Sequence, residues 1–152
     1  MFARRWIVVP VALMSLAVMT PAQDTPENEV RAAIMGTLAA WSAGDFDRLA
    51  SAYGAQTRGF LFGGAALVKG FNPAALQAAY EAGFRATFDA RGLDVKVMGD
   101  AAIAVAYLDG TLTLPGGEEE AGSWRYSETR VKDGGDWKIV QYHFSKLVIP
   151  SR

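Results

Sequence analysis

The sequence predicts a single α+β domain in which the helices precede most of the strands. Residues 26–43 and 46–53 carry apolar side chains at helical spacing, and a third helical segment begins at Asn72. From Gly92 onward, alternating apolar residues and glycine-containing turns indicate four long antiparallel strands. This segregation of helices and strands is typical of α+β folds. We expect three helices packed on a strongly curved antiparallel or mixed sheet, which forms a cone with a cavity inside.

Residues 1–22 have the features of a secretory signal peptide. Arg4 and Arg5 form a short basic region, a largely apolar run follows, and small residues precede a cleavage position after Ala22. The apolar run is shorter than the roughly 20 residues that a membrane-spanning helix needs. We therefore expect a periplasmic or secreted protein with no membrane attachment after cleavage, whose mature part, residues 23–152, forms one domain. Export by the general route and by the twin-arginine route both remain open.

The composition disfavours several classes of function. The full chain has a net charge of −1, and loss of the leader removes two arginines but no acid, so the mature chain lacks the basic surface that nucleic-acid binding requires. There is no cysteine, so neither a disulfide nor a lipid-modified cysteine can form. One histidine, with no cysteine and no acid pair at ligand spacing, does not make a metal site. We expect no metal and no other cofactor.

The predicted helices have clear end signals. Thr25 can cap the first helix ahead of Pro26. Gly44 can end this helix, and Asp45 can cap the second. Asn72 can cap the third. The inward faces follow helical spacing and consist of Val30, Ala33, Ile34, Thr37, Leu38 and Trp41 in the first helix, Phe46, Leu49, Ala50 and Tyr53 in the second, and Leu76, Ala79, Tyr80, Phe84 and Phe88 in the third.

The predicted strands are separated by turns and loops. Residues 59–70, between the second and third helices, indicate two short strands around Gly63-Gly64. The four long strands are expected at 93–99, 101–114, 123–132 and 136–147, connected by turns at 99–100 and 133–136 and by a polar loop at 114–122.

The last strand contains the only histidine of the chain. With a period of two, one face of this strand carries Trp137, Ile139, Gln141, His143 and Ser145. The imidazole of His143 should then lie on the same side as Trp137 and Ile139. We expect it to line the cavity, or to be a structural ring bonded to a backbone carbonyl or to Ser145.

Three stretches of sequence carry a resemblance to a known family. They are W-S-A-G-D-F-D-R-L at 41–49, V-K-G at 68–70 and G-D-W-K-I-V-Q-Y-H-F-S at 135–145. In order and spacing they resemble the SnoaL-like branch of the nuclear transport factor 2-like superfamily. The final stretch is also similar to the association domain of calcium/calmodulin-dependent kinase II. The superfamily includes isomerases, dehydratases, cyclases, scaffolds and simple binding proteins, so the resemblance implies a fold without fixing a function.

The resemblance also implies a pocket formed by the last two strands. In the similar association domains, an arginine on the penultimate strand and a histidine on the last face a pocket for a small carboxylate. This implies His143 and, from E-T-R-V at 128–131, Arg130, whereas the SnoaL-like pattern implies Arg125 instead. Because the two arginines lie on opposite faces by parity, at most one can face the cavity unless a bulge intervenes. Glu128 joins this candidate set, either in the pocket or as the partner of an arginine in a structural ion pair.

Aromatic residues are numerous enough to line a cavity. Tyr53 can point a hydroxyl into it, and Trp41 can contribute a ring. The rest of the aromatic set consists of Phe46, Phe60, Phe62, Phe84, Tyr107 and Trp124. Asp89, Asp94, Asp100 and Asp109 lie at or near turns, and no carboxylate is expected to be buried in the middle of a strand. Catalytic residues are therefore left unassigned, as is the question of whether the protein is an enzyme.

Three functions are compatible with these features. The leading hypothesis is an exported homodimer, paired through its sheet, that binds a small organic ligand in the conical cavity, with a carboxylate as one option. The second is a lyase or isomerase of the ketosteroid isomerase or dehydratase type, acting on a small cyclic or carbonyl substrate. The third is a structural or interaction module that dimerises through its sheet.

Overall fold

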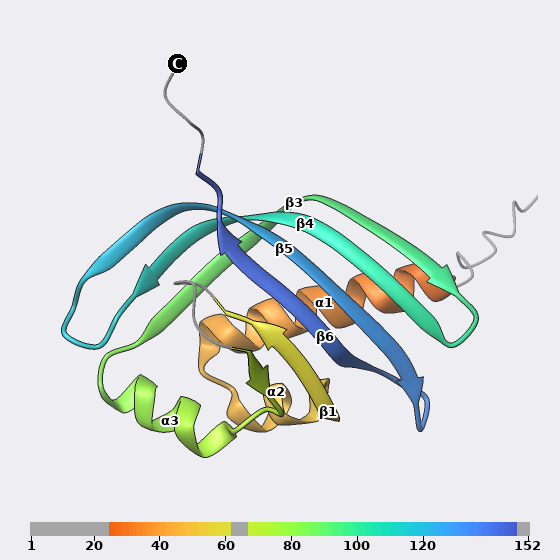
Figure 1. Cartoon of the computed structure of the whole chain (residues 1–152), viewed down its shortest axis with the longest axis horizontal. Helices are drawn as coiled ribbons and strands as arrows, with labels where there is room; N and C mark the ends of the chain where they lie inside the picture. The colour runs from red at the N-terminus through yellow and green to blue at the C-terminus, as the bar shows by residue number, and fades with distance from the viewer. Residues whose placement is uncertain (1–24, 62–66, 149–152) are drawn as a thin grey trace, which may run out of the picture.

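The computed structural model describes residues 25–61 and 67–148, which form three helices and six strands. The long strands arch over the first helix, so that the helices lie on the concave side of an open, curved sheet (Figure 1). This confirms the predicted α+β cone. The predicted signal peptide and the Gly63-Gly64 turn lie outside the described residues. Within the described part of the chain, no helix has the length and apolarity needed to cross a bilayer.

The helices begin and end largely where the sequence predicts. Helix α1 spans Pro26–Ala43, and the Thr25 hydroxyl accepts a hydrogen bond of 3.3 Å from the Asn28 amide. It ends at Gly44, whose positive φ of 67° favours glycine. Helix α2 spans Phe46–Ala52. Helix α3 spans Pro73–Glu81 and is capped by Asn72, so the predicted continuation to Phe84 and Phe88 is wrong, because the chain turns after Glu81 and enters a strand.

The spacing predicted that Tyr53 belongs to the second helix. In the structure, Tyr53 is instead the first residue of a strand. Strand β1 spans Tyr53–Phe60, and β2 consists of Val68–Lys69. Strand β1 runs parallel to the last strand and antiparallel to β2. This position brings the Tyr53 side chain beside Tyr142 of the last strand, with their ring centroids 5.8 Å apart.

The four long strands are β3 (Arg85–Met98), β4 (Ala101–Thr113), β5 (Glu119–Asp133) and β6 (Asp136–Lys146). The strand order is β2-β1-β6-β5-β4-β3, and neighbouring strands among the four long ones are antiparallel. Strand β3 begins well before Gly92 and continues through it. Gly92, with a φ of 64°, lies in a register shift between Arg91 and Asp94, so the glycine does not interrupt the strand. The predicted loop at 114–122 is shorter than expected, since β5 already begins at Glu119.

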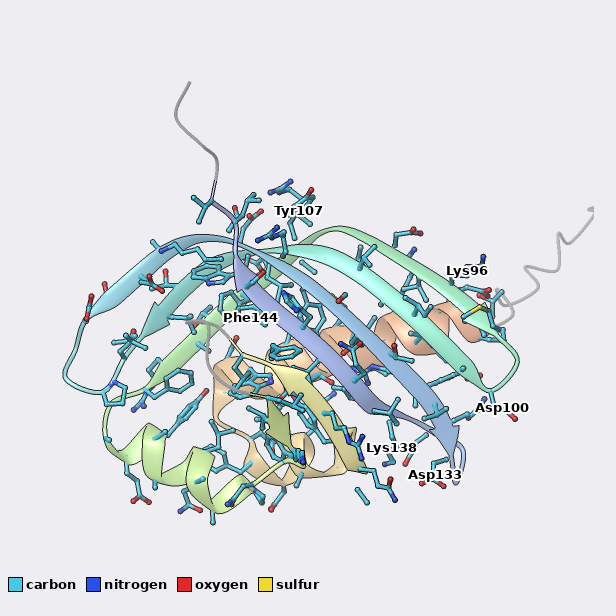
Figure 2. The ribbon with its side chains drawn as sticks, in the orientation of Figure 1. Lys96, Asp100, Tyr107, Asp133, Lys138 and Phe144 are labelled. Atoms are coloured by element: carbon cyan, nitrogen blue, oxygen red, sulfur yellow. The ribbon has the colours of Figure 1, made fainter. Side chains whose placement is uncertain are left out.

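The core lies between α1 and the concave face of the sheet. Val30, Ile34 and Leu38 of α1 are buried against the sheet residues of the same cluster. On the sheet, Trp124 is completely buried and stacks on Phe144 with their ring centroids 5.9 Å apart. Phe144 points from β6 toward the concave side, whereas Tyr107 projects from the convex side (Figure 2). The concave face therefore supplies both the core and the walls of any internal cavity.

A bulge in β6 places His143 on the face of the sheet opposite to the predicted one. Thr129 pairs with Gln141, but the next residue, Arg130, pairs with Ile139, so Val140 is the extra residue. Trp137 and Ile139 before the bulge are buried, and after it the buried residues are Tyr142 and Phe144. His143 consequently lies on the convex face. The expectation that it shares a face with Trp137 and Ile139 is wrong, because one inserted residue inverts the alternation.

Candidate functional site

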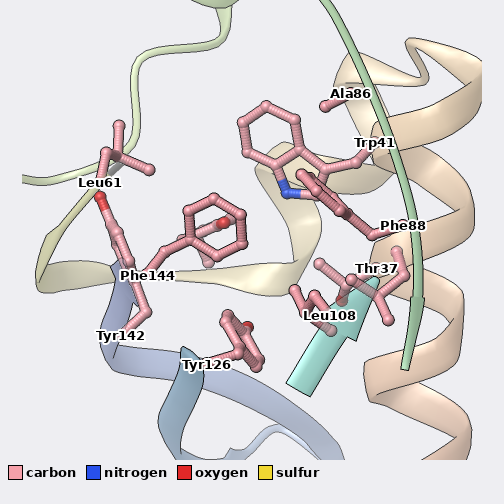
Figure 3. A pocket seen from close by; sticks show the side chains of 11 residues that line it. Thr37, Trp41, Leu61, Ala86, Phe88, Leu108, Tyr126, Tyr142 and Phe144 are labelled. Atoms are coloured by element: carbon pink, nitrogen blue, oxygen red, sulfur yellow. The ribbon is translucent and has the colours of Figure 1, made fainter. Parts of the chain in front are cut away.

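A two-chambered cavity lies between the helices and the concave face of the sheet. The inner chamber has a volume of about 40 Å³ and the outer one about 400 Å³. Trp41, Tyr53, Leu61 and Tyr142 line both chambers, so the two chambers adjoin each other. The side chains around the inner chamber are shown in Figure 3 and are Thr37, Leu38, Trp41, Tyr53, Leu61, Ala86, Phe88, Leu108, Tyr126, Tyr142 and Phe144.

The outer chamber lies between α3 and the loop that connects β4 to β5. Ala75 and Leu76 of α3 form one wall, and Pro115 of the loop forms another. Phe71, just before α3, stacks on Tyr53 with their ring centroids 4.4 Å apart and an angle of 8° between the ring planes. Aromatic faces and aliphatic side chains therefore dominate the space through which a ligand would reach the inner chamber.

A polar cluster on β5 lies behind the inner chamber. The Tyr126 hydroxyl donates to Oε2 of Glu128, and Nε of Arg130 donates to Oε1 of the same carboxylate at 2.5 Å. The guanidinium also donates to Oγ1 of Thr37 at 3.0 Å and to the Trp137 carbonyl at 3.1 Å. The charged side chains are essentially unexposed, with 0% of Glu128 and 2% of Arg130 accessible. The buried charges therefore neutralise each other and have hydrogen-bond partners.

Small residues on β4 make room for this cluster. Ala102, Ala104 and Ala106 are buried and pair with Arg130, Glu128 and Tyr126, respectively. Directly opposite residues of antiparallel strands share a face and have neighbouring Cβ atoms. Large side chains at these three positions would fill the space that the carboxylate and the guanidinium occupy.

Burial and the neighbouring carboxylate set the protonation state of Tyr126. Burial is the main cause that raises the pKa of Tyr126 well above its ordinary value, and the negative charge of Glu128 raises it further. The phenol therefore keeps its proton at neutral pH and donates it to Glu128. Toward a ligand, the Tyr126 oxygen can act only as an acceptor.

Tyr53 provides the complementary polar group. Burial raises the pKa of Tyr53 above its ordinary value, and a hydrogen bond from the Trp41 indole opposes part of this rise. Since the Tyr53 oxygen accepts from the indole, its own proton is available to an acceptor on a ligand. The Thr37 hydroxyl has no proton to offer a ligand, because it donates to the Ala33 carbonyl at 2.9 Å, and it also accepts from Arg130.

The structure brings four of the six predicted site residues together. Trp41 and Tyr53 line both chambers, and Glu128 and Arg130 form the ion pair behind the inner one. The expectation that no carboxylate is buried in mid-strand is wrong. Glu128 is buried on the concave face, where its charge is neutralised by Arg130, two residues along the same strand. The spacing E-x-R on the buried face was the signal that could have revealed it.

The other two predicted residues lie elsewhere. Arg125 and His143 line a separate hollow on the convex face together with Tyr107 and Ser127. Arg125 and Arg130 thus lie on opposite faces of β5, as their parity predicts. The expectation that His143 faces the cavity is wrong, because the bulge at Val140 turns the ring outward.

Sequence reasoning missed Tyr126 as a cavity residue. Its position two residues from Trp124 and two from Glu128 places it on the concave face, and this parity could have identified it. Phe71 was missed too, because its stacking on Tyr53 depends on how the segment before α3 returns to β1.

A comparison with models of known families gives a match over most of the chain. The model of the SnoaL-like domain family matches residues 30–150. No curated protein matches the chain.

Solved structures share the fold at low sequence identity. A nuclear transport factor 2-like protein from Cytophaga hutchinsonii is 13% identical with a TM-score of 0.68, over 81% of this chain and 99% of that one. A ketosteroid isomerase-like protein from Erwinia carotovora atroseptica is 19% identical with a TM-score of 0.66, over 81% and 97% of the two chains. A candidate dehydratase from Streptomyces avermitilis is 17% identical with a TM-score of 0.66, over 84% and 100%. These structures show that the chain has the nuclear transport factor 2-like fold, and the family match shows that it belongs to the SnoaL-like domain family.

Proposed function

We propose that the protein binds a small, uncharged and largely apolar molecule in the two-chambered cavity. The observation that carries this proposal is the closed ion pair between Glu128 and Arg130. Because the charge of Arg130 is already matched, a ligand carboxylate in this cavity would find no free cation among the described residues that line it, and burying it would cost free energy. This favours a neutral ligand over a carboxylate at this site.

The lining also indicates which neutral groups fit. The Tyr53 hydroxyl can donate a hydrogen bond, and the Tyr126 oxygen can accept one. An alcohol or a phenol can do both in return. The aromatic and aliphatic walls of the outer chamber suit a ring system, which would leave the hydroxyl end toward the smaller inner chamber.

Three probes with the same ring system test this proposal. 2-Naphthol, naphthalene and 2-naphthoate differ only in the group that would reach the two tyrosines. We expect calorimetry to show the tightest binding for 2-naphthol and at least tenfold weaker binding for 2-naphthoate, since its charge would be buried unpaired. Equal affinities for 2-naphthol and 2-naphthoate would contradict a neutral site.

Variants locate the binding of 2-naphthol. Tyr126→Phe removes the acceptor and should weaken binding by about 3- to 10-fold, the usual net contribution of a neutral hydrogen bond. Ala75→Trp places a large ring at an exposed position on the wall of the outer chamber and should abolish binding. The matched control is Ala78→Trp, which lies on an exposed position of α3 outside the lining.

A lyase or isomerase is the second candidate function. It is favoured by the hydrogen bond between Tyr126 and Glu128, which gives the inner end of the cavity a proton that can move between two oxygens. A carbon acid held against the Tyr126 oxygen would lose its proton to that oxygen while the phenolic proton passes to Glu128. The names of two structural neighbours, ketosteroid isomerase-like and dehydratase, point in the same direction.

Proton exchange tests the enzyme hypothesis without a known substrate. Cyclohexanone in D2O would exchange its α-protons faster with the wild-type protein than in buffer, and Glu128→Gln would remove the acceleration. Exchange at the buffer rate for this ketone and for a panel of other cyclic ketones would argue for binding alone.

For the cellular location, we propose export followed by cleavage after Ala22. The basic start, the short apolar run and the small residues before the cleavage position support it. N-terminal sequencing of the protein from a periplasmic fraction should begin at Gln23, whereas an intact leader in the cytoplasm would contradict export.

A further inference from the structure

We propose that a polar hollow beside Arg48 and Lys138 binds a phosphate group. The hollow has a volume of about 250 Å³ and is lined by residues of α1, α2, β5 and β6. Of these residues only Thr37 also lines the internal cavity, and the argument for the polar hollow does not depend on the function proposed for that cavity. The charged residues of the lining are Arg48, Lys138, Arg130 and Asp136.

Arg48 supplies the unmatched positive charge of the polar hollow. Its backbone amide donates to Oδ1 of Asp45 at 3.0 Å, which caps α2. Its guanidinium, in contrast, takes part in no hydrogen bond or ion pair within the described part of the chain. All five N–H groups of this guanidinium are therefore available to a ligand.

Gly36 of α1 makes room for this guanidinium. A Cβ atom at position 36 would lie 2.6 Å from Nη2 of Arg48, which is closer than such atoms can approach. The guanidinium thus lies against the backbone of α1, at a position in the interior of the helix where alanine would be the more stable residue. This close contact holds the charge of Arg48 at the wall of the polar hollow.

Lys138 brings a second cation from β6. Its Nζ donates to the Ser51 carbonyl at 2.7 Å and to Oδ2 of Asp136 at 3.1 Å. An ammonium group has three N–H donors, so one remains for a ligand. The bond to Ser51 ties the ammonium to α2, the same helix that carries Arg48. The two cations therefore belong to one rigid part of the fold.

Arg130 adds a buried donor from β5. Its guanidinium makes four hydrogen bonds, which it donates to Glu128, Thr37 and the Trp137 carbonyl. Nη1 carries two N–H groups but donates only to Trp137, so its second N–H has no acceptor among the described residues. Buried N–H groups are normally bonded, so this one favours an acceptor in the hollow that Arg130 lines.

These donors fit a phosphate group. They come from three different elements, so an anion with several acceptor oxygens can reach them together, and a guanidinium binds phosphate through two parallel hydrogen bonds. Glu128 offsets Arg130 and Asp136 offsets Lys138, which leaves the charge of Arg48 to attract the anion. Asp136 is the only acid in the lining, and it can accept the proton that inorganic phosphate keeps at neutral pH. Sulfate has no such proton.

Three anions test the proposal by calorimetry at constant ionic strength. We expect inorganic phosphate to bind saturably, with one anion per chain. Sulfate should bind about tenfold more weakly, because its oxygens would face the Asp136 carboxylate without a proton between them. Methyl phosphate distinguishes the two sources of a phosphate group. Binding as tight as that of inorganic phosphate identifies an ester, weaker binding identifies the free ion, and either result supports the site.

Variants locate the bound phosphate. Arg48→Gln should weaken binding about tenfold or more, whereas Arg58→Gln, at an exposed position of β1 outside the lining, should leave it unchanged. Gly36→Ala keeps every charge but displaces the guanidinium of Arg48. It should weaken binding roughly 3- to 10-fold. It should not lower the Tm, because alanine favours the helix and only the end of a flexible side chain has to move.

Several results would overturn the proposal. They are an absence of saturable phosphate binding in the millimolar range, equal affinities of Arg48→Gln and Arg58→Gln, and wild-type affinity in Gly36→Ala. Sulfate binding as tightly as phosphate would contradict the assignment to a phosphate group. Ala75→Trp, in the wall of the internal cavity, should leave phosphate binding unchanged, and a loss of binding in this variant would place the anion in that cavity instead. Circular dichroism checks that each variant is folded.

Discussion

Glu128 and Arg130 form a buried ion pair within one strand, with 2.5 Å between Oε1 and Nε. Residues two apart on a strand point to the same face, so the pair forms without any contribution from a neighbouring strand. The guanidinium also donates hydrogen bonds to the Thr37 hydroxyl and to the Trp137 carbonyl. The pair fixes where charge lies at the back of the cavity, and it leaves the cavity itself with neutral polar groups.

Breaking this pair should destabilise the protein strongly. Glu128→Gln leaves the buried charge of Arg130 unmatched, and we expect the free energy of unfolding to fall by about 3–5 kcal/mol in urea denaturation. Glu120→Gln is the control, because Glu120 pairs with Lys146 near the surface and its loss should cost about 1 kcal/mol or less. Similar losses of unfolding free energy in the two variants would show that the buried pair contributes no more to stability than the surface pair does.

Removing both charges should be less harmful than removing one. In the double variant Glu128→Gln with Arg130→Met, no unmatched charge remains in the interior, so part of the lost stability should return. Urea denaturation of the two single variants and the double variant completes the cycle. Additive losses would mean that the two side chains do not interact across their short contact.

The buried tyrosines should make the protein sensitive to alkali. The pKa of Tyr126 is raised above its ordinary value near 10, so the unfolded chain loses this proton at a lower pH than the folded chain does. The stabilising contribution is complete below about pH 10 and is lost as pH rises toward the folded pKa. Urea midpoints measured from about pH 9 to 11 should fall less steeply for Tyr126→Phe than for wild type. If the midpoints of Tyr126→Phe fall as steeply with pH as those of wild type and of a Tyr107→Phe control on the convex face, the burial of Tyr126 is contradicted.

Gly59 should not tolerate a side chain. A Cβ atom at this position would lie 2.4 Å from the Tyr142 carbonyl oxygen and 2.6 Å from the Tyr142 ring, so β1 and β6 would have to separate at the cavity. We expect Gly59→Ala to lower the free energy of unfolding by about 1–3 kcal/mol. Arg58→Ala, at the exposed neighbouring position, should change it little. Equal stability of both variants would indicate that the two strands are further apart than described.

The convex face supports the expectation of a homodimer. Met98, Ile103 and Val105 are 46%, 43% and 46% exposed on this face or its margin. A partner sheet would cover them, and Ile103→Asp would place a charge in that contact. Light scattering should give twice the chain mass for wild type and for the control Lys69→Glu on β2, and the single-chain mass for Ile103→Asp. A monomeric wild type would contradict this expectation.

Local signals were sufficient to predict where the three helices begin and the order of the elements. Thr25, Gly44, Asp45 and Asn72 perform the capping roles that their side chains or their backbone freedom suggest. Such signals depend on neighbours in sequence, and a single chain displays them directly.

The facing of His143 could not be predicted in the same way. The bulge at Val140 appears only when β6 is paired with β5, and nothing in Q-Y-H-F-S marks the extra residue. The burial of Glu128 has the same origin. The E-x-R spacing places Arg130 on the same face as Glu128, but the space for their side chains comes from the alanines of β4, which become their neighbours only in the folded sheet.

The location of a bound neutral ligand tests the central claim most directly. In a crystal structure of the protein with 2-naphthol, we expect the ring in the outer chamber beside Tyr53 and Phe71, and the hydroxyl within hydrogen-bond distance of the Tyr126 oxygen. A ring bound instead on the convex face beside Arg125, or chambers closed by side chains with no ligand inside, would contradict the account.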